Sequence, residues 1–486
     1  MKIIKKSEVG SFTSAIKIQF LNLLISNNMS WKLSEIYEAL NKKFENTKDL
    51  KLNRISIDSR KINKNDFFIA ISGKRFDGHG FIDEVSNLGV KACLVEKNKR
   101  SLIKNKKIHK IFVDDTQKSL EKLAIYSRNK IKNLIMICIT GSTGKTSLKE
   151  WLGIILGKKF KTHVNPGNYN NHIGMPLSLI NMPLNTEVCV LELGMNKFGE
   201  IKKLAKISKP TISIITNIGS AHIGNFNQQK DIAEEKSDIF CFLTKASYAV
   251  VPHESKYYEK LFQKASIKTN KIISFGTKFN SDAKYEYLNK DKYLFSILNK
   301  EIILKKINFF QHWEKNILIV LAILKILDLK FSVFKDYLEK LKPLKGRGES
   351  TKIYFRKKTF FLLDESYNSS PQSLEKAIIN ASKLANNSKL ILVIGDMLEL
   401  GKYSKELHLK IHKTVKRISP SIIFTVGEFS ELISKKLPSK IMTQHFKSFD
   451  NVYERLIEEI GHNDIVMIKG SNSINLSRIC EKLKKK

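Results

Sequence analysis

Cysteine is scarce in this sequence, and its few copies lie far apart. The five residues stand mostly inside apolar, strand-like runs, and no two of them form a C-x-x-C pair: Cys93, Cys138, Cys189, Cys241 and Cys480. Zinc sites and disulfide frameworks need cysteines at close, characteristic spacings. The sequence therefore indicates neither, and we expect a reducing, cytoplasmic location.

Long uninterrupted apolar runs are also missing. The longest, 317–327, contains Lys325 and is shorter than the roughly 20 residues that span a bilayer. The N-terminal letters MKIIKK precede an apolar stretch that is broken by Lys17, Gln19 and Asn22, which makes a poor signal peptide. We therefore expect no stable membrane insertion.

Acidic residues are few beside basic ones, 47 against 85, which gives a formal net charge of +38. An excess of this size suggests nucleic acid or another anionic partner. The lysines, however, are spread through every segment together with many isoleucines and asparagines, and no basic stripe with interleaved aromatics appears. We expect no nucleic-acid partner, although a basic protein suits polyanionic small substrates. A nucleic-acid-stimulated P-loop ATPase remains an alternative of a different class.

The length of 486 residues implies several domains. Short strands separated by helices recur along the chain, which predicts an α/β fold with parallel, doubly wound sheets. We expect an N-terminal extension followed by three α/β domains: 1–28, 29–133, 134–342 and 343–486. Pro343, Gly346 and Gly348 mark the last boundary. The extension is either a flexible arm or a stretch ahead of a true start at Met29.

Apolar periodicity places the main elements. Strands are expected at 55–57, 67–71, 92–95, 134–139, 188–191, 211–216, 360–363, 390–394, 422–426 and 465–468. Helices are expected up to Leu40 with Ser34 as the N-cap, at 81–88, at 148–156 and at 313–327. The lysine-rich stretch 268–306 is expected to form hairpin-like strands.

The run ITGSTGKTS, from Ile139 to Ser147, is the most informative stretch of the chain. A strand, a glycine turn and Lys-Thr at the start of a helix form the arrangement that cradles nucleotide phosphates. Lys145 would neutralise phosphate charge, and the Thr146 hydroxyl would reach Mg²⁺. Ile139 occupies the place of the usual first glycine, so the loop is of a shortened kind. An ordinary strand-to-helix turn would not explain Lys-Thr at this position.

Polar residues follow the ends of later strands. Glu192 ends an apolar strand, where a carboxylate commonly holds the metal of a nucleotide, although a capping carboxylate is an alternative. His222 follows the next strand, and a lone histidine is more often structural than a ligand. Lys236 stands beside two acids on a predicted helix, which favours a surface ion-pairing lysine. The adjacent amides Asn170 and Asn171 suit a polar ligand, but a turn explains them nearly as well.

The C-terminal third presents polar loops at three predicted strand ends. They contain Asp364, Tyr367 and Asn368, then Asp396 and Glu399, and finally Lys469, Gly470 and Ser471. Because the carboxyl ends of parallel strands share one edge of a sheet, the three loops together predict one wall of a cleft.

Taken together, these motifs resemble the Mur ligase family of peptidoglycan synthesis, from about residue 30 to the end. The resemblance is carried by IDSRKINKNDFFIAISGKRFDGHGF, GSTGKTS, GNYNNHIGMP, LELGMNKFGEI, ITNIGSAHIGNF, DESYNSSP and GDMLELG. The shortened phosphate loop is the form that this family uses. DESYNSSP and GDMLELG point to the members that add D-alanyl-D-alanine, and the Asp-Asn-Pro-Arg box of the diaminopimelate-adding members is absent.

The resemblance implies a three-domain architecture with a central P-loop ATPase domain and a Rossmann-like C-terminal domain. It implies an ATP-dependent amide ligase that joins D-alanyl-D-alanine to UDP-MurNAc-tripeptide through an acyl phosphate, with ATP and Mg²⁺ as cofactors. A monomer is expected. The alternative within the superfamily is another Mur ligase or a folylpolyglutamate-type ligase.

The resemblance also implies roles for individual residues. ATP would be held by Gly141, Ser142, Thr143, Gly144, Lys145, Thr146, Ser147, His312, Asn316, Arg347, Asp364, Tyr367 and Asn368. Mg²⁺ would be held by Thr146, Glu192, His222 and a carbamylated Lys236. Catalysis would depend on Lys145, Lys236, His222 and Arg347. The substrates would be held by Asp58, Ser59, Arg60, Asp77, Gly78, His79, Asn170, Asn171, Lys469 and Ser471, the first six at the UDP end.

Four residues, at three places, depart from the family pattern. Glu365 replaces an aspartate, and Ser369 with Ser370 replaces Ala-Asn before Pro371. Asn472 stands where an arginine often follows Lys-Gly-Ser, which leaves open how the carboxylate of the dipeptide is held.

Overall fold

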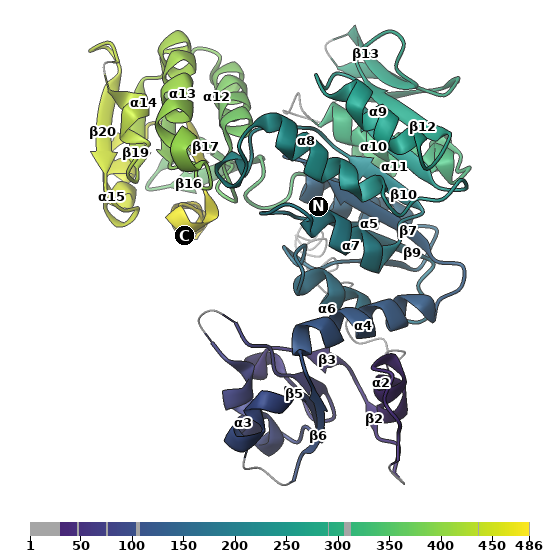
Figure 1. Cartoon of the computed structure of the whole chain (residues 1–486). Helices are drawn as coiled ribbons and strands as arrows, with labels where there is room; N and C mark the ends of the chain where they lie inside the picture. The colour runs from purple at the N-terminus through teal and green to yellow at the C-terminus, as the bar shows by residue number, and fades with distance from the viewer. Residues whose placement is uncertain are drawn as a thin grey trace, which may run out of the picture. The chain divides into compact units, whose positions relative to one another are not determined.

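The computed structural model describes residues 30–45, 48–73, 76–103, 107–289, 291–305, 313–435 and 437–485. The expected extension at 1–28 and the expected nucleotide contact His312 lie outside these residues. Two compact units divide the chain, and β7 begins at their junction (Figure 1). The first runs to Ile135 and takes in Phe160–Cys189, and the second contains Met136–Lys159 and Val190–Lys486. No helix in the described ranges is long and apolar enough to cross a membrane.

The first unit contains a four-stranded parallel sheet in the order β3-β4-β5-β6. Its strands are Ile55–Ser56, Phe67–Ile69, Ala92–Glu96 and His109–Val113, and its helices include α2 (Leu33–Ala39), α3 (Ile82–Asn87), α4 (Thr116–Asn129) and α6 (Gly174–Ile180). The short strands β1 (Trp31–Lys32) and β2 (Lys51–Leu52) pair antiparallel. The predicted strands and the helix at 81–88 are confirmed, whereas β6 and α4 were not expected.

The predicted N-cap of α2 is wrong. Lys32 occupies that position, and Ser34 lies inside the helix, where its hydroxyl donates a 2.7 Å hydrogen bond to Asp49. A carboxylate from the following loop therefore takes the hydroxyl that would otherwise cap the helix.

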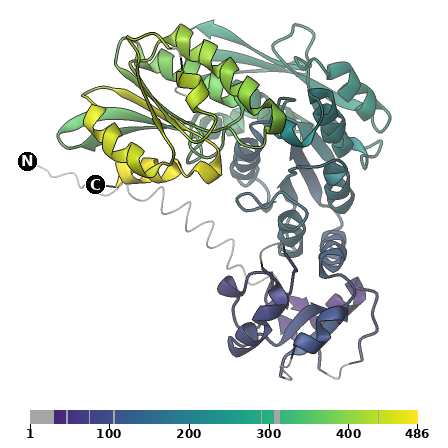
Figure 2. The same cartoon turned by 60° about the vertical axis from the view of Figure 1, so that its left-hand side comes forward.

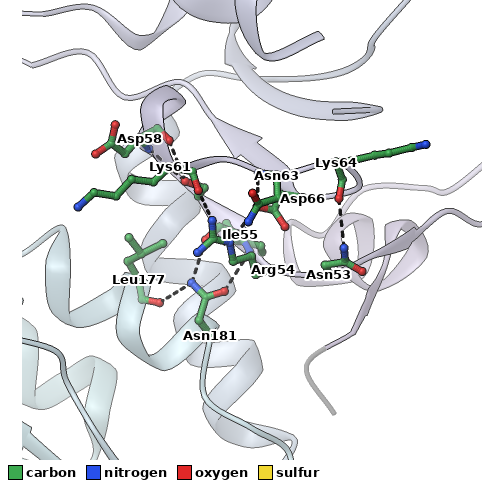
Figure 3. Close-up of polar contacts among 11 residues, drawn as sticks. Asn53, Arg54, Ile55, Asp58, Lys61, Asn63, Lys64, Asp66, Leu177 and Asn181 are labelled. Carbon is green, nitrogen blue, oxygen red and sulfur yellow. Dashed lines mark hydrogen bonds and ion pairs between the residues drawn. The ribbon is translucent and has the colours of Figure 1, made fainter. Parts of the chain in front are cut away.

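Residues Phe160–Cys189 belong to the first unit through polar contacts around α6. The carboxamide of Asn181 bonds to both backbone groups of Ile55, accepting from its N–H at 3.0 Å and donating to its carbonyl at 2.8 Å (Figure 3). It also donates to Leu177 O at 3.0 Å. Trp31 and Ser127 donate to backbone carbonyls at the end of the same helix. The side chain of Asn181 thus continues the hydrogen bonding of β3 in place of another strand.

The central sheet has nine strands in the order β15-β14-β13-β12-β11-β10-β7-β9-β8. In chain order they are β7 Ile135–Thr140, β8 Thr162–Val164, β9 Val188–Glu192, β10 Ile212–Ile215, β11 Tyr248–Pro252, β12 Lys271–Gly276, β13 Ala283–Asn289, β14 Lys292–Ile297 and β15 Lys300–Lys305. The pairs β7–β10 and β10–β11 are parallel. β14 pairs antiparallel with both β13 and β15. The expected hairpins in the lysine-rich stretch are confirmed.

Helices accompany the central sheet. They are α5 (Lys145–Leu156), α7 (Glu200–Ser208), α8 (Gln229–Ser237), α9 (Tyr258–Ser266), α10 (Glu314–Ile326) and α11 (Phe331–Glu339). The continuous apolar run of α10 is buried from Ile317 to Leu324. A helix that is apolar all round is stable only when it is covered on all sides, so this helix lies in the core.

The C-terminal sheet has the order β16-β17-β21-β18-β19-β20. Its strands are Glu349–Phe355, Lys358–Asp364, Ile465–Lys469, Leu390–Gly395, Ile422–Val426 and Met442–Phe446, and its helices are α12 (Pro371–Ala385), α13 (Ser404–Ile418), α14 (Glu431–Ser434), α15 (Asp450–Glu459) and α16 (Ser477–Lys484). Only β16 is antiparallel, as an edge strand. Neither β16 nor β20 was expected.

Both faces of this sheet are covered by helices (Figure 2). Val452 and Leu456 of α15 and Leu483 of α16 share one core with alternate strand residues such as Phe360 and Leu362. Successive side chains of a strand point to opposite faces, so the other set faces α12, which contacts β18 and β21. The predicted doubly wound arrangement is confirmed.

Candidate active site

The phosphate loop joins β7 to α5, and two glycines are required by its geometry. Gly141 has φ +147° and Gly144, the N-cap of α5, has φ +82°. A Cβ on Gly141 would lie 1.9 Å from Thr216 Oγ1, and one on Gly144 would lie 3.2 Å from Asn316 Oδ1. Glycine adopts these backbone angles without a side-chain clash. The shortened loop therefore keeps the two glycines that its path needs.

Lys145 bonds to its own loop. Its Nζ donates to Gly141 O at 2.8 Å. Burial lowers the pKa of Lys145, and the positive charge of Arg347 lowers it further, while Glu192 opposes the shift. An added phosphate group would offset this cost, because an anion favours the charged form of a buried lysine.

Thr146 stands between an acid and a base. Its hydroxyl donates a 2.6 Å hydrogen bond to Glu192 Oε2 and accepts one of 2.9 Å from Arg347 Nη2. The guanidinium of Arg347 lies 4.0 Å from the ring centroid of Tyr367. Three of the predicted ATP residues and the predicted metal ligand Glu192 thus meet at the N-terminus of α5.

The donor set fits Mg²⁺ only together with a nucleotide. Within the described ranges, no group of three or more His, Cys, Asp and Glu side chains could hold a metal ion by itself. Mg²⁺ usually takes one or two carboxylates and completes its shell with water and substrate phosphates. The Thr146 hydroxyl and the buried Glu192 carboxylate supply the protein's share of such a shell.

Asn316 lies close to the same loop. Its Nδ2 donates a long 3.5 Å bond to Gly144 O, and the residue is buried on α10. Ser147 follows Thr146 in the first turn of α5. These positions agree with the predicted nucleotide contacts, and their roles stay predictions.

His222 meets a carboxylate of the C-terminal sheet. Its Nδ1 lies 2.6 Å from Glu399 Oε2, and its backbone has φ +63°. The contact with His222 lowers the pKa of Glu399, against the effect of burial. Glu399 stands in the GDMLELG loop, which the sequence marked as polar without assigning it a role.

The GDMLELG loop is held from within by His408. The buried imidazole accepts the backbone N–H of Met397 at its Nε2 (3.0 Å), and its Nδ1 lies 2.7 Å from Ser404 O. An acceptor Nε2 requires the neutral ring with its proton on Nδ1. Burial lowers the pKa of His408, which favours that form. Sequence patterns gave no sign of this residue.

Lys236 is buried, so its interpretation as a surface ion-pairing lysine is wrong. The residue is 1% exposed on α8. Burial lowers its pKa far below the ordinary value, the charge of Lys145 adds to the shift, and Glu235 and Glu192 oppose it. The neighbouring Glu235 accepts the backbone N–H groups of Gly199 and Ile201 at the start of α7, which explains one of the two adjacent acids. Lys236 is therefore an amine with a strong tendency to be neutral.

The polar loops of the C-terminal sheet are engaged with one another. Asp364 accepts from Ser366 and from Lys484 Nζ at 2.9 Å. Burial by itself would raise the pKa of Asp364, but these donors hold that pKa below the ordinary value. Lys469 is buried and donates to Asn368 O at 2.9 Å, and Ser471 Oγ accepts the N–H of Leu398. The predicted ATP and substrate contacts of these residues therefore stay predictions.

Asp396 has a structural role in the same sheet. Its carboxylate accepts the backbone N–H groups of Glu428, Phe429 and Ser430 at 2.7 to 3.0 Å. Three such bonds satisfy most of the hydrogen-bonding capacity of a carboxylate. Asp396 thus fixes the loop after β19.

The residues predicted for the UDP end lie in the first unit. Arg60 pairs with Asp58 through two bonds of 2.9 and 3.0 Å and is exposed. His79 is buried, with Nδ1 2.6 Å from Asp77 and Nε2 accepting the N–H of Glu96. Both ring nitrogens of His79 are therefore engaged within the unit. The predicted contacts of His79 and Arg60 with the UDP end stay predictions.

Three further predicted residues of this unit are explained by local geometry. A Cβ on Gly78 would lie 2.8 Å from Ile71 N, so the residue must be glycine. Ser59 is buried in a short 3₁₀ turn. Asn171 accepts the N–H groups of Ile173 and Gly174 at the start of α6, which is the turn alternative, and Asn170 precedes it.

Comparison with known proteins shows the family of this chain. Family models match the Mur ligase middle domain at residues 139–324, the Mur ligase glutamate ligase domain at 354–472, and the domain described as "Mur ligase family, catalytic domain" at 51–128. The UDP-N-acetylmuramoyl-tripeptide–D-alanyl-D-alanine ligase of Rickettsia prowazekii is 32% identical, with 93% of this chain and 99% of that protein covered. The chain belongs to the Mur ligase family.

Other relatives of this Mur ligase give the same picture. The enzyme of that name from Bacillus subtilis is 29% identical, with 88% of this chain and 92% of that protein covered. A crystal structure of MurF from Acinetobacter baumannii is 26% identical, covers 95% of this chain and all of its own, and has a TM-score of 0.82. MurF from Thermotoga maritima in complex with ADP has a TM-score of 0.75 at 25% identity, over 89% of this chain and 97% of that one. The predicted three-domain Mur ligase architecture is confirmed, and the domain bounds given above stay predictions.

Proposed function

We propose that this Mur ligase adds D-alanyl-D-alanine to UDP-MurNAc-tripeptide at the expense of ATP. The observation that carries the proposal is the meeting of Lys145, Thr146, Glu192 and Arg347 at a phosphate loop, in a chain whose relatives over nearly their full length bear the name of that ligase. The relative from Thermotoga maritima was solved with ADP. A folylpolyglutamate-type ligase is not favoured, since a solved structure of Escherichia coli FolC is only 15% identical and shows the fold alone.

The first step must activate a carboxylate, which is a poor electrophile. An oxygen of the tripeptide's terminal carboxylate bonds to the γ-phosphorus of ATP, and ADP leaves. Two anions are thereby brought together, so cations beside the loop lower the barrier. Lys145 and Arg347 are placed for this task, one within the loop and one on the hydroxyl of Thr146.

The second step forms the amide. The amine nitrogen of D-alanyl-D-alanine bonds to the activated carbonyl carbon, the bond to the phosphate oxygen breaks, and the amine proton passes to solvent as phosphate leaves. Bound Mg²⁺ would offset phosphate charge and orient the reacting groups. We propose that Thr146, Glu192 and His222 would hold it.

Lys236 suits conversion to a carbamate. A neutral amine adds CO₂ through a new N–C bond and loses a proton, which turns a cation into an anion that can ligate a metal. The burial and lowered pKa of Lys236 favour the reacting neutral form. We propose that Lys236 is carbamylated in the active enzyme.

The contact between the GDMLELG loop and the loop of His222 would keep water from the acyl phosphate. Gly224 donates to Glu399 O at 2.9 Å, and the hydroxyl of Tyr403 donates to Asn227 O. Excluding water protects a reactive intermediate from hydrolysis.

The decisive experiment measures phosphate release with UDP-MurNAc-tripeptide, with and without D-alanyl-D-alanine, together with the mass of the product. We expect release that depends on the dipeptide and a pentapeptide product. ATP hydrolysis that does not depend on the dipeptide but rises strongly with DNA or RNA would overturn the proposal. Parallel assays with diaminopimelate or lysine as the third residue identify the natural peptide. Since its substrates include nucleotides and none of its five cysteines forms a disulfide bond, we also propose a cytoplasmic location.

A further inference from the structure

The carboxamide of Asn217 occupies the curve of the phosphate loop. Its Oδ1 accepts two backbone N–H groups, from Ser142 at 3.0 Å and Thr143 at 2.9 Å. Its Nδ2 donates to Thr143 Oγ1 at 2.6 Å. One side chain, from the residue that follows Thr216 after β10, therefore makes three bonds to two consecutive loop residues.

Neighbouring residues complete a frame around the loop. Thr216 Oγ1 donates to Thr143 O at 2.6 Å. Ser142 Oγ accepts the N–H of Gly219 at 2.8 Å, and Ser142 N also lies 3.1 Å from Asn217 O. All of these partners come from residues 216–219, directly after β10, the strand next to β7 in the sheet. The path of the loop is thus set by the adjacent strand end.

These bonds satisfy backbone N–H groups of the shortened loop. Two successive N–H groups that converge on one point form a concavity that attracts anions. Here a neutral amide oxygen fills that concavity, so the concavity is satisfied without a charge. The N–H groups of the first turn of α5, which have no partner within the helix, and Lys145 are left to face the polyphosphate.

We propose that Asn217 is a positioning residue that holds the phosphate loop in its nucleotide-binding shape before the nucleotide arrives. The inference rests on the proposed use of ATP and assigns Asn217 no contact with the reacting atoms. A neutral amide is required at this place, because a carboxylate would keep the two accepted bonds yet put a negative charge beside the phosphates.

The test compares Asn217→Asp and Asn217→Ala in the full-length protein by calorimetric titration with Mg²⁺ and ADP. Loss of the bonds in Asn217→Ala should weaken ADP binding about tenfold. Asn217→Asp should weaken it at least as much while keeping most of the thermal stability, because its shape and two of its bonds remain. The KM for ATP should rise in both variants by more than kcat falls.

Asn181 provides a matched control. Its carboxamide also makes three bonds, all of them to backbone groups of the first unit (Figure 3). Asn181→Ala should lower the melting temperature and leave ADP affinity within twofold of the wild type. A loss of ADP affinity in Asn217→Asp but not in Asn181→Ala supports the positioning role.

Wild-type ADP affinity in Asn217→Asp would overturn the inference, because Asn217 would then contribute only to the stability of the fold. If Asn217→Ala does not fold, Asn217→Asp still decides the question. Failure of the wild-type protein itself to bind ADP would instead overturn the proposed function. The two failures are therefore distinguishable.

Discussion

The backbone N–H of Gly224 donates a 2.9 Å hydrogen bond to the carbonyl oxygen of Glu399. The two residues belong to the loop that follows β10 and to the GDMLELG loop that follows β18. A Cβ on Gly224 would lie 2.4 Å from Gly401 N and 2.7 Å from Glu399 O. The two backbones approach so closely that only glycine fits, and the contact brings the Glu399 carboxylate to His222.

Gly224→Ala should separate these loops and lower kcat. The added methyl group meets only the GDMLELG loop among its three nearest neighbours, so the phosphate loop should keep its shape. We expect kcat to fall by about tenfold or more, because excluding water and completing the site depend on this contact. ADP affinity, measured by calorimetry, should stay within twofold of the wild type.

Gly80→Ala is the matched control, because a Cβ on Gly80 meets nothing within 4 Å. Neither glycine has a positive φ, so the two substitutions differ mainly in what the methyl group touches. Unchanged kcat in Gly224→Ala would show that the contact between the two loops has no part in turnover.

Much of the fold follows from the sequence because periodicity is a local property. The apolar run before ITGSTGKTS is buried as β7, and the long apolar helix near 313–327 is α10. β20 was not foreseen, because Met442–Phe446 has three polar residues in a row between its apolar ends and so shows no strand periodicity. Ser34 was placed wrongly as a cap, since its partner Asp49 lies beyond the helix in a later loop.

The site is harder to predict, because its geometry depends on contacts between distant segments. Motif spelling located Lys145, Thr146, Glu192 and Arg347, and the structure brings them together. The motifs did not reveal Asn217, although its position directly after a buried strand was a sequence signal of a functional residue. The burial of Lys236 could not be predicted either, because a lysine beside two acids on a short helix is equally typical of an exposed helix.

Lys236→Ala should abolish ligase activity, and small carboxylic acids should restore part of it. The substitution removes the amine that would carry the carbamate, and a free carboxylate can enter the space left by the side chain. We expect activity to rise with added acetate or formate in this variant alone. Lys260→Ala, on the neighbouring helix, is the control, since Lys260 pairs with Glu234 at the surface. Absence of rescue, together with a wild type that is insensitive to CO₂ removal, would contradict carbamylation.

Glu192→Gln should raise the Mg²⁺ concentration needed for half-maximal activity by about tenfold or more. The glutamine oxygen can still accept from Thr146, but the charge that attracts the metal is gone. The measurement is a Mg²⁺ titration of ADP binding and of turnover at fixed nucleotide. Glu200→Gln serves as control, because Glu200 only accepts backbone N–H groups of Asn196 and Lys197. Equal Mg²⁺ dependence in Glu192→Gln and the wild type would remove Glu192 from the metal site.

Lys484→Met should destabilise the C-terminal sheet at neutral pH by roughly 1–3 kcal/mol. Lys484 donates to the buried Asp364 and also pairs with Glu349, and its loss leaves a buried carboxylate with fewer donors. The lowered pKa of Asp364 fixes the pH dependence. Because the folded pKa lies below the unfolded value, this stabilisation is present above about pH 4 and is lost as pH falls through the folded pKa.

The stability difference between Lys484→Met and the wild type, measured by urea unfolding, should therefore shrink as the pH is lowered below about 4. Lys345→Met is the control in the same region, because Lys345 pairs with Glu481 at the exposed surface and such pairs contribute little. A difference between Lys484→Met and the wild type that stays constant from neutral to acid pH would show that Lys484 acts through packing alone. In that case the ionised state of Asp364 would depend on Ser366 and not on the C-terminal helix.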